Sequence, residues 1–307
     1  DGVDQTPGIE PVRQAYRDPG AGRDGGPRDA NASAIRRPTV GMRDQIRSWM
    51  FDVALPFWAH HGVDRENGGF VEQLTPEGFD ADVHFKRTRV AGRQIYVFSH
   101  AHILGWNAGA DCAAAGVDFL LSRCWQGPQN GFARTLLRSG DVLDSTPDLY
   151  DHAFVLFALA WRHKACGDPL SRDWMHRTLD FLETHMRHPG GEGFWHERPP
   201  NGWRLQNPHM HLTEACLAAY EATGESRFAA LAHDLVLLFQ NRLFDPTTGT
   251  LREYFDDDWR PATGVAGDLV EPGHMFEWAW ILNQARSLIG SDVSDLARRL
   301  VGFAEAH

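Results

Sequence analysis

Lysine and cysteine are scarce in this chain, and long hydrophobic runs are missing. Lys86 and Lys164 are its only lysines, and neither belongs to a G-x-x-x-x-G-K-[ST] phosphate-binding loop. The four cysteines are scattered without C-x-x-C spacing, which argues against a disulfide framework and against a thiolate zinc site. No apolar segment approaches the roughly 20 residues that a membrane helix needs. These absences favour a soluble globular protein with reduced thiols, as expected in the cytoplasm.

Positive charge is also in deficit. The sequence has 41 acidic and 30 basic residues, and its formal net charge is -11 over 307 residues. Proteins that bind nucleic acids or anionic membranes present basic stripes that release counterions, and this chain has no such stripe. The composition therefore predicts neither a nucleic-acid partner nor a membrane partner.

Residues 1–40 differ from the rest of the chain. They are rich in glycine, proline and alternating charge, and they contain almost no large apolar residue. Such a segment cannot bury enough surface to offset its ordering entropy, so we expect it to be disordered. It also lacks the apolar stretch of a signal peptide.

Residues 41–307 contain a repeat of roughly 60 residues. Glycine marks the same place in each unit, at Gly69, Gly131, Gly193 and Gly249. Each of these glycines lies in a turn-rich segment beside a short β-favouring run, as in PQNGFARTLLRSGDVL. This combination is typical of β-hairpins.

Pairs of helical patterns lie between the hairpins. In YDHAFVLFALAW, Phe154, Phe157 and Trp161 recur at helical spacing and the neighbouring residues are largely apolar, which indicates a helix buried on most sides. The second helix of each pair is amphipathic, as in SRFAALAHDLVLLFQNRLF. We expect a first helix at 41–60 and pairs at 89–107 with 110–125, 147–165 with 170–187, 206–223 with 225–243, and 270–289 with 291–306.

One inner and one outer helix in each repeat predict an all-α fold, the (α/α)6 barrel, a toroid of helical hairpins joined by short β-hairpin loops. Six pairs of roughly 60 residues need about 350 residues. Residues 41–307 hold about four and a half pairs, so we expect an incomplete barrel domain that lacks its C-terminal quarter. Apolar faces at an open end favour association, for example as a homodimer.

Polar residues recur where each inner helix begins, and a toroid brings equivalent positions together at one mouth. They are Arg93, Tyr150, Asp151, His152, Asn207, His209, His211, Glu214, Glu271, His274, Glu277 and Trp278. Helix N-termini favour anionic or oxyanionic groups. The repeat therefore predicts a polar pocket with an aromatic rim.

Two histidines in this set have a carboxylate at helical spacing. His211 and Glu214 are i,i+3, as are His274 and Glu277, so each pair shares a helix face. A carboxylate beside an imidazole fixes its tautomer and raises its basicity, which suits a general acid or base. We therefore interpret His211 and His274 as catalytic candidates.

Other histidines and two tryptophans have simpler interpretations. His209 and His211 could ligate zinc together with a carboxylate, but their i,i+2 spacing points them to different helix faces, so no metal site is expected. His152 and His209 are each interpreted as structural. Trp259 and Trp278 lie near the predicted mouth, and either indole could stack on the apolar face of a sugar ring.

Five motifs in order resemble the N-acylglucosamine 2-epimerase family, which includes mannose isomerases and cellobiose 2-epimerases. They are RVAGRQIYVFSHA, DLYDHAFVLFALA, NPHMHLTEA, REYFDDDW and EPGHMFEWAWIL, and the resemblance runs from about residue 42 to the end. It implies an (α/α)6 barrel enzyme that interconverts free sugars at C1 and C2 by proton transfer through a cis-enediol. It also implies that no metal or redox cofactor takes part and that the partner is a small-molecule sugar.

The resemblance also assigns residues. Arg93 resembles the arginine that holds and polarises the substrate near its carbonyl, and His274 resembles one of two catalytic acid/base histidines. The residues that resemble sugar-hydroxyl and ring-opening contacts are Tyr150, Asn207, His211 and Glu277. The family's second catalytic histidine would lie beyond residue 307. Epimerisation needs acid/base groups on both faces of C2, so we expect this chain alone to be impaired in it.

The reaction and two other function classes stay open. Mannose/fructose isomerisation and 2-epimerisation of N-acylglucosamine to N-acylmannosamine are both compatible with these residues. A glycoside hydrolase on an α-toroid would use two carboxylates, for which Asp151 and Glu277 are the candidates. A non-catalytic sugar-binding remnant is the third interpretation.

Overall fold

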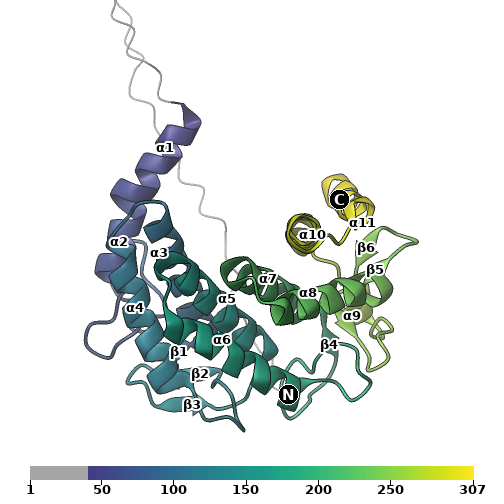
Figure 1. The fold of residues 1–307 in the computed structure, drawn as a ribbon, viewed down its shortest axis with the longest axis horizontal. Helices are drawn as coiled ribbons and strands as arrows, with labels where there is room; N and C mark the ends of the chain where they lie inside the picture. Colours follow the sequence, from purple (N-terminus) through teal and green to yellow (C-terminus); the bar gives the residue numbers. More distant parts are fainter. Residues whose placement is uncertain (1–40) are drawn as a thin grey trace, which may run out of the picture. The chain divides into compact units, whose positions relative to one another are not determined.

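Helices dominate residues 41–307, the part of the chain that this computed structural model describes (Figure 1). The disorder expected for residues 1–40 lies outside the described residues. A first helical stretch consists of α1 (Met42–Ser48), the π-helical segment η1 (Trp49–Ala54) and α2 (Leu55–His61). None of the described helices is both long enough and apolar enough to cross a lipid bilayer.

Four helix pairs follow within residues 41–307. They are α3 (Thr88–Ile103) with α4 (Gly109–Phe119), α5 (Leu149–Cys166) with α6 (Pro169–Phe181), α7 (Gln206–Thr223) with α8 (Ser226–Leu238), and α10 (Pro272–Ile289) with α11 (Ser294–Ala306). The outer helices α4, α6 and α8 continue into the short π-helical segments η2 (Leu120–Cys124), η3 (Leu182–Met186) and η4 (Phe239–Leu243). The single-turn α9 (Val265–Asp268) precedes α10. The predicted four and a half pairs are confirmed.

Inner and outer helices differ in burial as the sequence predicts. The inner helices α3, α5, α7 and α10 pack on one another in chain order, and each outer helix packs on its own inner partner (Figure 1). In α5, every residue from 151 to 160 is buried, whereas in α6 buried positions such as Ser171, Met175 and Thr178 recur at helical spacing. A helix between two inner neighbours and an outer one has no face left for water.

Helix α10 shows the opposite case. Its inner neighbour within the described residues is α7, and its buried residues fall on one side, including Met275, Trp278 and Ile281. Phe276 and Trp280 on the same helix are about half exposed. When an inner helix has an inner neighbour on just one side, apolar side chains on its other side stay in contact with water.

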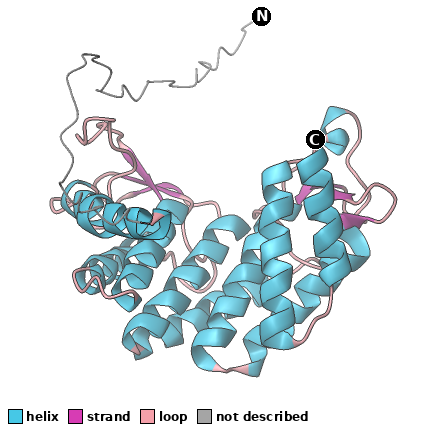
Figure 2. Ribbon diagram, turned by 90° about the horizontal axis from the view of Figure 1, so that it is seen from above, coloured by secondary structure: helices cyan, strands magenta, loops and turns pink. Residues whose placement is uncertain are grey.

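The strands are short and stand between helices in the chain, and helices make up most of the ribbon (Figure 2). β1 (Phe85–Arg87), β2 (Thr135–Leu137) and β3 (Val142–Asp144) form an antiparallel sheet in the order β1-β2-β3. β4 (Arg204–Leu205) pairs with β7 (Tyr254–Phe255), and β5 (Phe244–Asp245) pairs with β6 (Thr250–Leu251). β1 and β4 lead directly into α3 and α7, so strand pairing helps to position the N-terminal ends of inner helices.

A buried histidine, His152, joins the tight turn at Gly131 to the first turn of α5. The Phe132 backbone N–H donates to His152 Nε2 at 3.0 Å, and His152 Nδ1 lies 2.7 Å from the Asp148 carbonyl oxygen. Gly131 sits beside this contact with φ +66°, and a Cβ there would collide with the His152 and Phe181 rings. Glycine is required here both for its left-handed backbone and for the close approach of the imidazole.

The same junction recurs one repeat later. The Phe194 N–H donates to His209 Nε2 at 3.0 Å, His209 Nδ1 lies 2.8 Å from the Leu205 carbonyl oxygen, and Gly193 has φ +68°. Burial, the largest cause, lowers the pKa of His152 to about 4 and that of His209 to about 3. The structural interpretation of both histidines is confirmed.

Replacing Gly131 by alanine tests this junction. Gly131→Ala should lower the free energy of unfolding by about 1 kcal/mol for the left-handed backbone and by a further 1–3 kcal/mol, roughly, for the collision with His152. Gly127→Ala is the matched control, because its φ is +92° and nothing lies within 4 Å of an added Cβ. Urea unfolding of both variants measures the difference. Equal losses would show that the contact with His152 carries no weight.

The lowered pKa values of the two histidines predict acid sensitivity. Below the ordinary histidine pKa of about 6.5, the unfolded chain binds protons that the folded chain refuses, so the free energy of unfolding should fall with pH. Each histidine should account for about 2 kcal/mol of this loss between pH 7 and pH 5. His152→Gln should flatten the pH dependence of urea unfolding, whereas His233→Gln, at an exposed position on α8, should leave it unchanged. An unchanged slope in His152→Gln would contradict the assignment.

Candidate active site

A cavity of about 450 Å³ opens where the inner helices begin. α3 contributes Arg89 and Arg93, α7 contributes Asn207, and α10 contributes His274. The full wall consists of Arg87, Arg89, Arg93, Asp148, Tyr150, His196, Leu205, Asn207, Pro208, Glu253, Tyr254, Leu269, Glu271 and His274. Arg93, Tyr150, Asn207 and His274, all expected at the mouth from the sequence, therefore share one wall.

Arg93 is the arginine of this wall whose charge is left available. Its Nη2 donates to the Tyr150 hydroxyl at 2.6 Å, and its guanidinium carbon lies 4.1 Å from the centroid of the Phe154 ring. Within residues 41–307 no carboxylate forms an ion pair with it. A guanidinium held by a phenol and a phenyl ring keeps N–H donors for an oxygen of a bound molecule.

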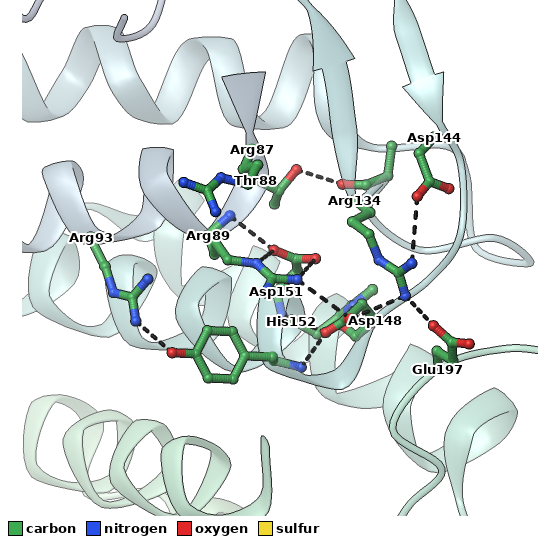
Figure 3. Close-up of polar contacts among 12 residues, drawn as sticks. Arg87, Thr88, Arg89, Arg93, Arg134, Asp144, Asp148, Asp151, His152 and Glu197 are labelled. Atoms are coloured by element: carbon green, nitrogen blue, oxygen red, sulfur yellow. Dashed lines mark hydrogen bonds and ion pairs between the residues drawn. The ribbon is translucent and has the colours of Figure 1, made fainter. Parts of the chain in front are cut away.

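Arg89, by contrast, forms ion pairs with two carboxylates of the protein. Its Nε and Nη2 donate to the two carboxylate oxygens of Asp151 at 2.8 and 2.9 Å, and Nη2 lies 3.4 Å from Asp148 (Figure 3). Asp151 is fully buried, and burial raises its pKa to about 6 against the opposing effect of Arg89. This two-point contact ties α3 to α5 and leaves the Asp151 oxygens no access to a substrate.

A second arginine forms ion pairs at the N-terminal end of α5. Arg134 contacts Asp148 at 3.1 Å and Asp144 at 3.5 Å, and it also pairs with Glu197 (Figure 3). Asp148 is the N-cap of α5, where its side chain accepts the backbone N–H groups of Tyr150 and Asp151. The position of Tyr150 in the cavity thus depends on a capped helix start that ion pairs hold in place.

His274 is paired with a carboxylate, but the carboxylate is Glu253 and not Glu277. His274 Nδ1 lies 2.9 Å from Glu253 Oε1, whereas Glu277 is exposed and lies outside the cavity wall. The hydrogen bond to Glu253, the largest cause, raises the pKa of His274 although burial opposes it. The expected i,i+3 pairing of His274 is therefore corrected, because a loop residue lies closer to the ring than the neighbour on its own helix.

His211 forms the pair predicted from its spacing. Its Nδ1 lies 3.1 Å from Glu214 Oε2, and its nearly buried ring packs edge-on to Tyr150 with a centroid distance of 5.0 Å. His211 is not part of the cavity wall but lies behind Tyr150. Its contact with the site therefore runs through the phenol ring.

The two tryptophans expected to stack on a sugar lie elsewhere. Trp278 is fully buried, with its ring 4.5 Å from that of Phe239. Trp259 is 5 % exposed, and the Arg204 guanidinium covers its ring at 3.6 Å. The structure corrects the expectation for both, because an indole face already covered by protein cannot receive a pyranose.

Glu271, which the sequence also placed at the mouth, lies on the wall. Wall residues that the sequence did not single out include His196 and Glu253, which lie in loops, and Tyr254, which begins strand β7. His196 is held by its backbone, whose carbonyl accepts the Leu149 N–H at 2.8 Å, and burial lowers its pKa. Loop residues have no periodicity that could announce which way they face. The only available signal for Glu253 was its place in the REYFDDDW motif.

Metal ligation by His209 is excluded by its hydrogen bonds, because both ring nitrogens are engaged with the backbone. Among residues 41–307, no group of three histidine, cysteine, aspartate or glutamate side chains is placed to hold a metal ion.

Comparison with known proteins identifies the family. Residues 68–306 match the family model described as N-acylglucosamine 2-epimerase (GlcNAc 2-epimerase). The chain belongs to the N-acylglucosamine 2-epimerase family. A relative from Rhizobium meliloti (strain 1021), named mannose-6-phosphate isomerase, is 38% identical over 245 residues, which are 78% of this chain and 62% of the relative. The chain thus spans less than two thirds of that relative.

Other members of the N-acylglucosamine 2-epimerase family extend the comparison. A cellobiose 2-epimerase from Bacteroides fragilis is 25% identical over 265 residues, 81% of this chain and 67% of the relative. The solved cellobiose 2-epimerase from Spirochaeta thermophila superposes with a TM-score of 0.79 at 25% identity, covering 89% of this chain and 72% of that one. The fold is that of the (α/α)6 barrels.

Proteins outside this family have a similar barrel fold. A glycoside hydrolase family 76 mannosidase from Bacteroides thetaiotaomicron superposes with a TM-score of 0.63 at 10% identity, covering 86% of this chain and 71% of that one. A likeness at this identity shows the fold alone.

Removing the carboxylate that holds Arg89 should destabilise the junction of α3 and α5. Asp151→Asn should lower the free energy of unfolding by about 3 kcal/mol, the lower end of the range for a broken buried pair, because Arg89 keeps Asp148. Asp180→Asn is the control, since Asp180 pairs with Arg227 on the surface and should matter by less than about 1 kcal/mol. Urea unfolding at neutral pH measures both, and similar small losses would contradict the role given to Asp151.

Proposed function

We propose that the chain carries a sugar isomerase or 2-epimerase site that acts on a free aldose by histidine-mediated proton transfer. The observation that supports this most strongly is the carboxylate-paired imidazole of His274 on the wall that also holds Arg93. Mannose/fructose isomerisation and N-acylglucosamine/N-acylmannosamine 2-epimerisation are the candidate reactions. No metal or redox cofactor is needed, because the step is a proton transfer.

In the proposed isomerisation, His274 removes the proton from C2 of the open-chain aldose to give a cis-enediolate and returns it to C1, while the O2 proton passes to O1. In 2-epimerisation, a second group would have to return a proton to the opposite face of C2. A base that operates near its own pKa can both take and return a proton, and the hydrogen bond to Glu253 raises the pKa of His274 above its ordinary value. Arg93 stabilises the negative charge that develops on the C1 or C2 oxygen. These roles fit the contacts of the two side chains, because His274 is paired with a carboxylate and Arg93 is not.

The remaining predicted residues are proposed to bind the sugar or to open its ring. Asn207 Oδ1 is buried and, within the described part of the chain, has no hydrogen-bond partner, so a sugar hydroxyl could donate to it. Tyr150 presents its hydroxyl next to Arg93. His211, which is paired with Glu214 and lies outside the cavity wall, is proposed to assist ring opening through its contact with Tyr150.

Glycoside hydrolysis is not favoured. It would require two carboxyl groups facing one glycosidic bond. The Asp151 oxygens are occupied by Arg89 in the interior, and Glu277 lies outside the cavity wall. The residues expected for that alternative therefore do not face a common space.

Proton exchange in heavy water tests the proposal. The 307-residue chain, incubated with mannose, N-acetylglucosamine, N-acetylmannosamine or cellobiose, should introduce deuterium at C2 of one of them, as followed by NMR. His274→Ala should reduce the rate by at least about 100-fold, since it removes the general base. His233→Ala, at an exposed position, is the control and should exchange at the wild-type rate.

Each alternative has a distinct outcome in this assay. Unchanged exchange in His274→Ala would remove His274 from the mechanism. Binding of a sugar without deuterium at C2 would support the non-catalytic interpretation. Release of a reducing sugar from a glycoside, without exchange, would support a hydrolase.

A further inference from the structure

We propose that Glu253 is a positioning residue that, together with Gln206, holds His274 in the tautomer with its proton on Nδ1. The inference rests on the proposed function in that it explains how His274 would present Nε2 as a base. It adds a buried chain of hydrogen bonds that runs from Trp278 to His274 and assigns one direction to every donor.

The chain of hydrogen bonds begins at an indole. Trp278 Nε1 lies 2.7 Å from Gln206 Oε1, and both side chains are fully buried. An indole N–H can only donate, so the oxygen of the Gln206 amide must face Trp278. The Gln206 NH2 group is thereby directed to the opposite side, and the ordinary ambiguity of an amide is removed.

Glu253 receives that NH2 group. Gln206 Nε2 lies 3.1 Å from Glu253 Oε1 and 2.9 Å from Oε2, and Glu253 is 5 % exposed. The backbones also meet, because the Gln206 N–H donates to the Glu253 carbonyl oxygen at 3.2 Å beside the β4–β7 pair. Glu253 therefore stands in a fixed position as an acceptor of hydrogen bonds.

The tautomer of His274 follows from its hydrogen bond to Glu253, whose position Gln206 fixes. Its Nδ1 lies 2.9 Å from Glu253 Oε1 and 3.2 Å from Gln206 Nε2. A bare Nδ1 would set its lone pair against a carboxylate oxygen, whereas an Nδ1–H donates to that oxygen. The Gln206 NH2 group donates to the two Glu253 oxygens, so its 3.2 Å approach to Nδ1 is a contact between two donors and not a hydrogen bond. Within residues 41–307, the hydrogen bond of the His274 ring is the one from Nδ1 to Glu253, which leaves Nε2 for a substrate.

Other charged side chains change the pKa of His274 without a hydrogen bond to Nδ1. Glu271 and Glu277 raise its pKa through charge alone and by less than Glu253 does. Arg89, Arg93 and His196 share the cavity wall with it. Within the described part of the chain, only Glu253 combines a charge with a hydrogen bond to the ring, so we assign the choice of tautomer to Glu253.

Nitrogen NMR of histidine-labelled protein tests the proposal directly. In the 307-residue chain, neutral His274 should show a protonated Nδ1 and a bare Nε2, and the resonance is assigned by its loss in His274→Gln. Glu253→Gln should lower the pKa of His274, because it removes both the charge and the carboxylate acceptor, and should move the neutral ring toward the tautomer protonated on Nε2. Thermal unfolding confirms that each variant is folded.

Two matched variants separate the hydrogen bond from the charge. Glu271→Gln removes the same charge from the cavity wall and should lower the pKa less, with the tautomer kept. Trp278→Phe keeps a ring but removes the N–H that orients the Gln206 amide. A turned amide would bring its oxygen, an acceptor, to Nδ1, and Glu253 would still accept from Nδ1–H, so this variant should keep the tautomer that Glu253→Gln loses.

Two results would overturn the proposal. One is a wild-type His274 protonated on Nε2 when neutral, which needs no variant to observe. The other is a Glu253→Gln spectrum indistinguishable from that of Glu271→Gln. Neither result depends on turnover, so failure of this proposal is distinguishable from failure of the isomerase proposal, which the heavy-water exchange decides.

Discussion

The structure depends on how each hairpin is joined to the first turn of the next inner helix. A hairpin packed against a helix start buries backbone N–H groups that must find acceptors. His152 and His209 supply these acceptors in successive repeats, and glycine beside each contact lets the imidazole approach. Where a hairpin is held in this way, the inner helix begins at a defined place, and the side chains of its first turn reach the cavity.

Charge pairing then decides which groups at this mouth remain available. Arg89 is neutralised by Asp151 and Asp148, and Arg87 pairs with Glu72, whereas the side chains that contact Arg93 within residues 41–307 are the phenol of Tyr150 and the ring of Phe154. The paired arginines stabilise the contacts around the cavity, and the unpaired Arg93 keeps N–H donors on the cavity wall. A site for an enediol needs such an asymmetry, because a guanidinium already paired with a carboxylate contributes little to an oxyanion.

The four histidines near the starts of α5, α7 and α10 show how environment divides residues of one type. His152 and His209 use both ring nitrogens on the backbone, and burial keeps them neutral. His211 and His274 instead each meet a carboxylate. The first pair belongs to the framework, and the second pair is suited to acid/base chemistry.

The sequence by itself determined the repeat, the helix pairs, the family and five residues of the cavity wall, including Arg93 and His274, because periodicity and glycine turns are local properties. Only the tertiary structure decided that His274 pairs with Glu253, that Trp278 is buried, and that Asp151 is occupied by Arg89. These contacts join elements far apart in the chain. Helical spacing predicts which side chains share a face, but not which loop or helix packs against it.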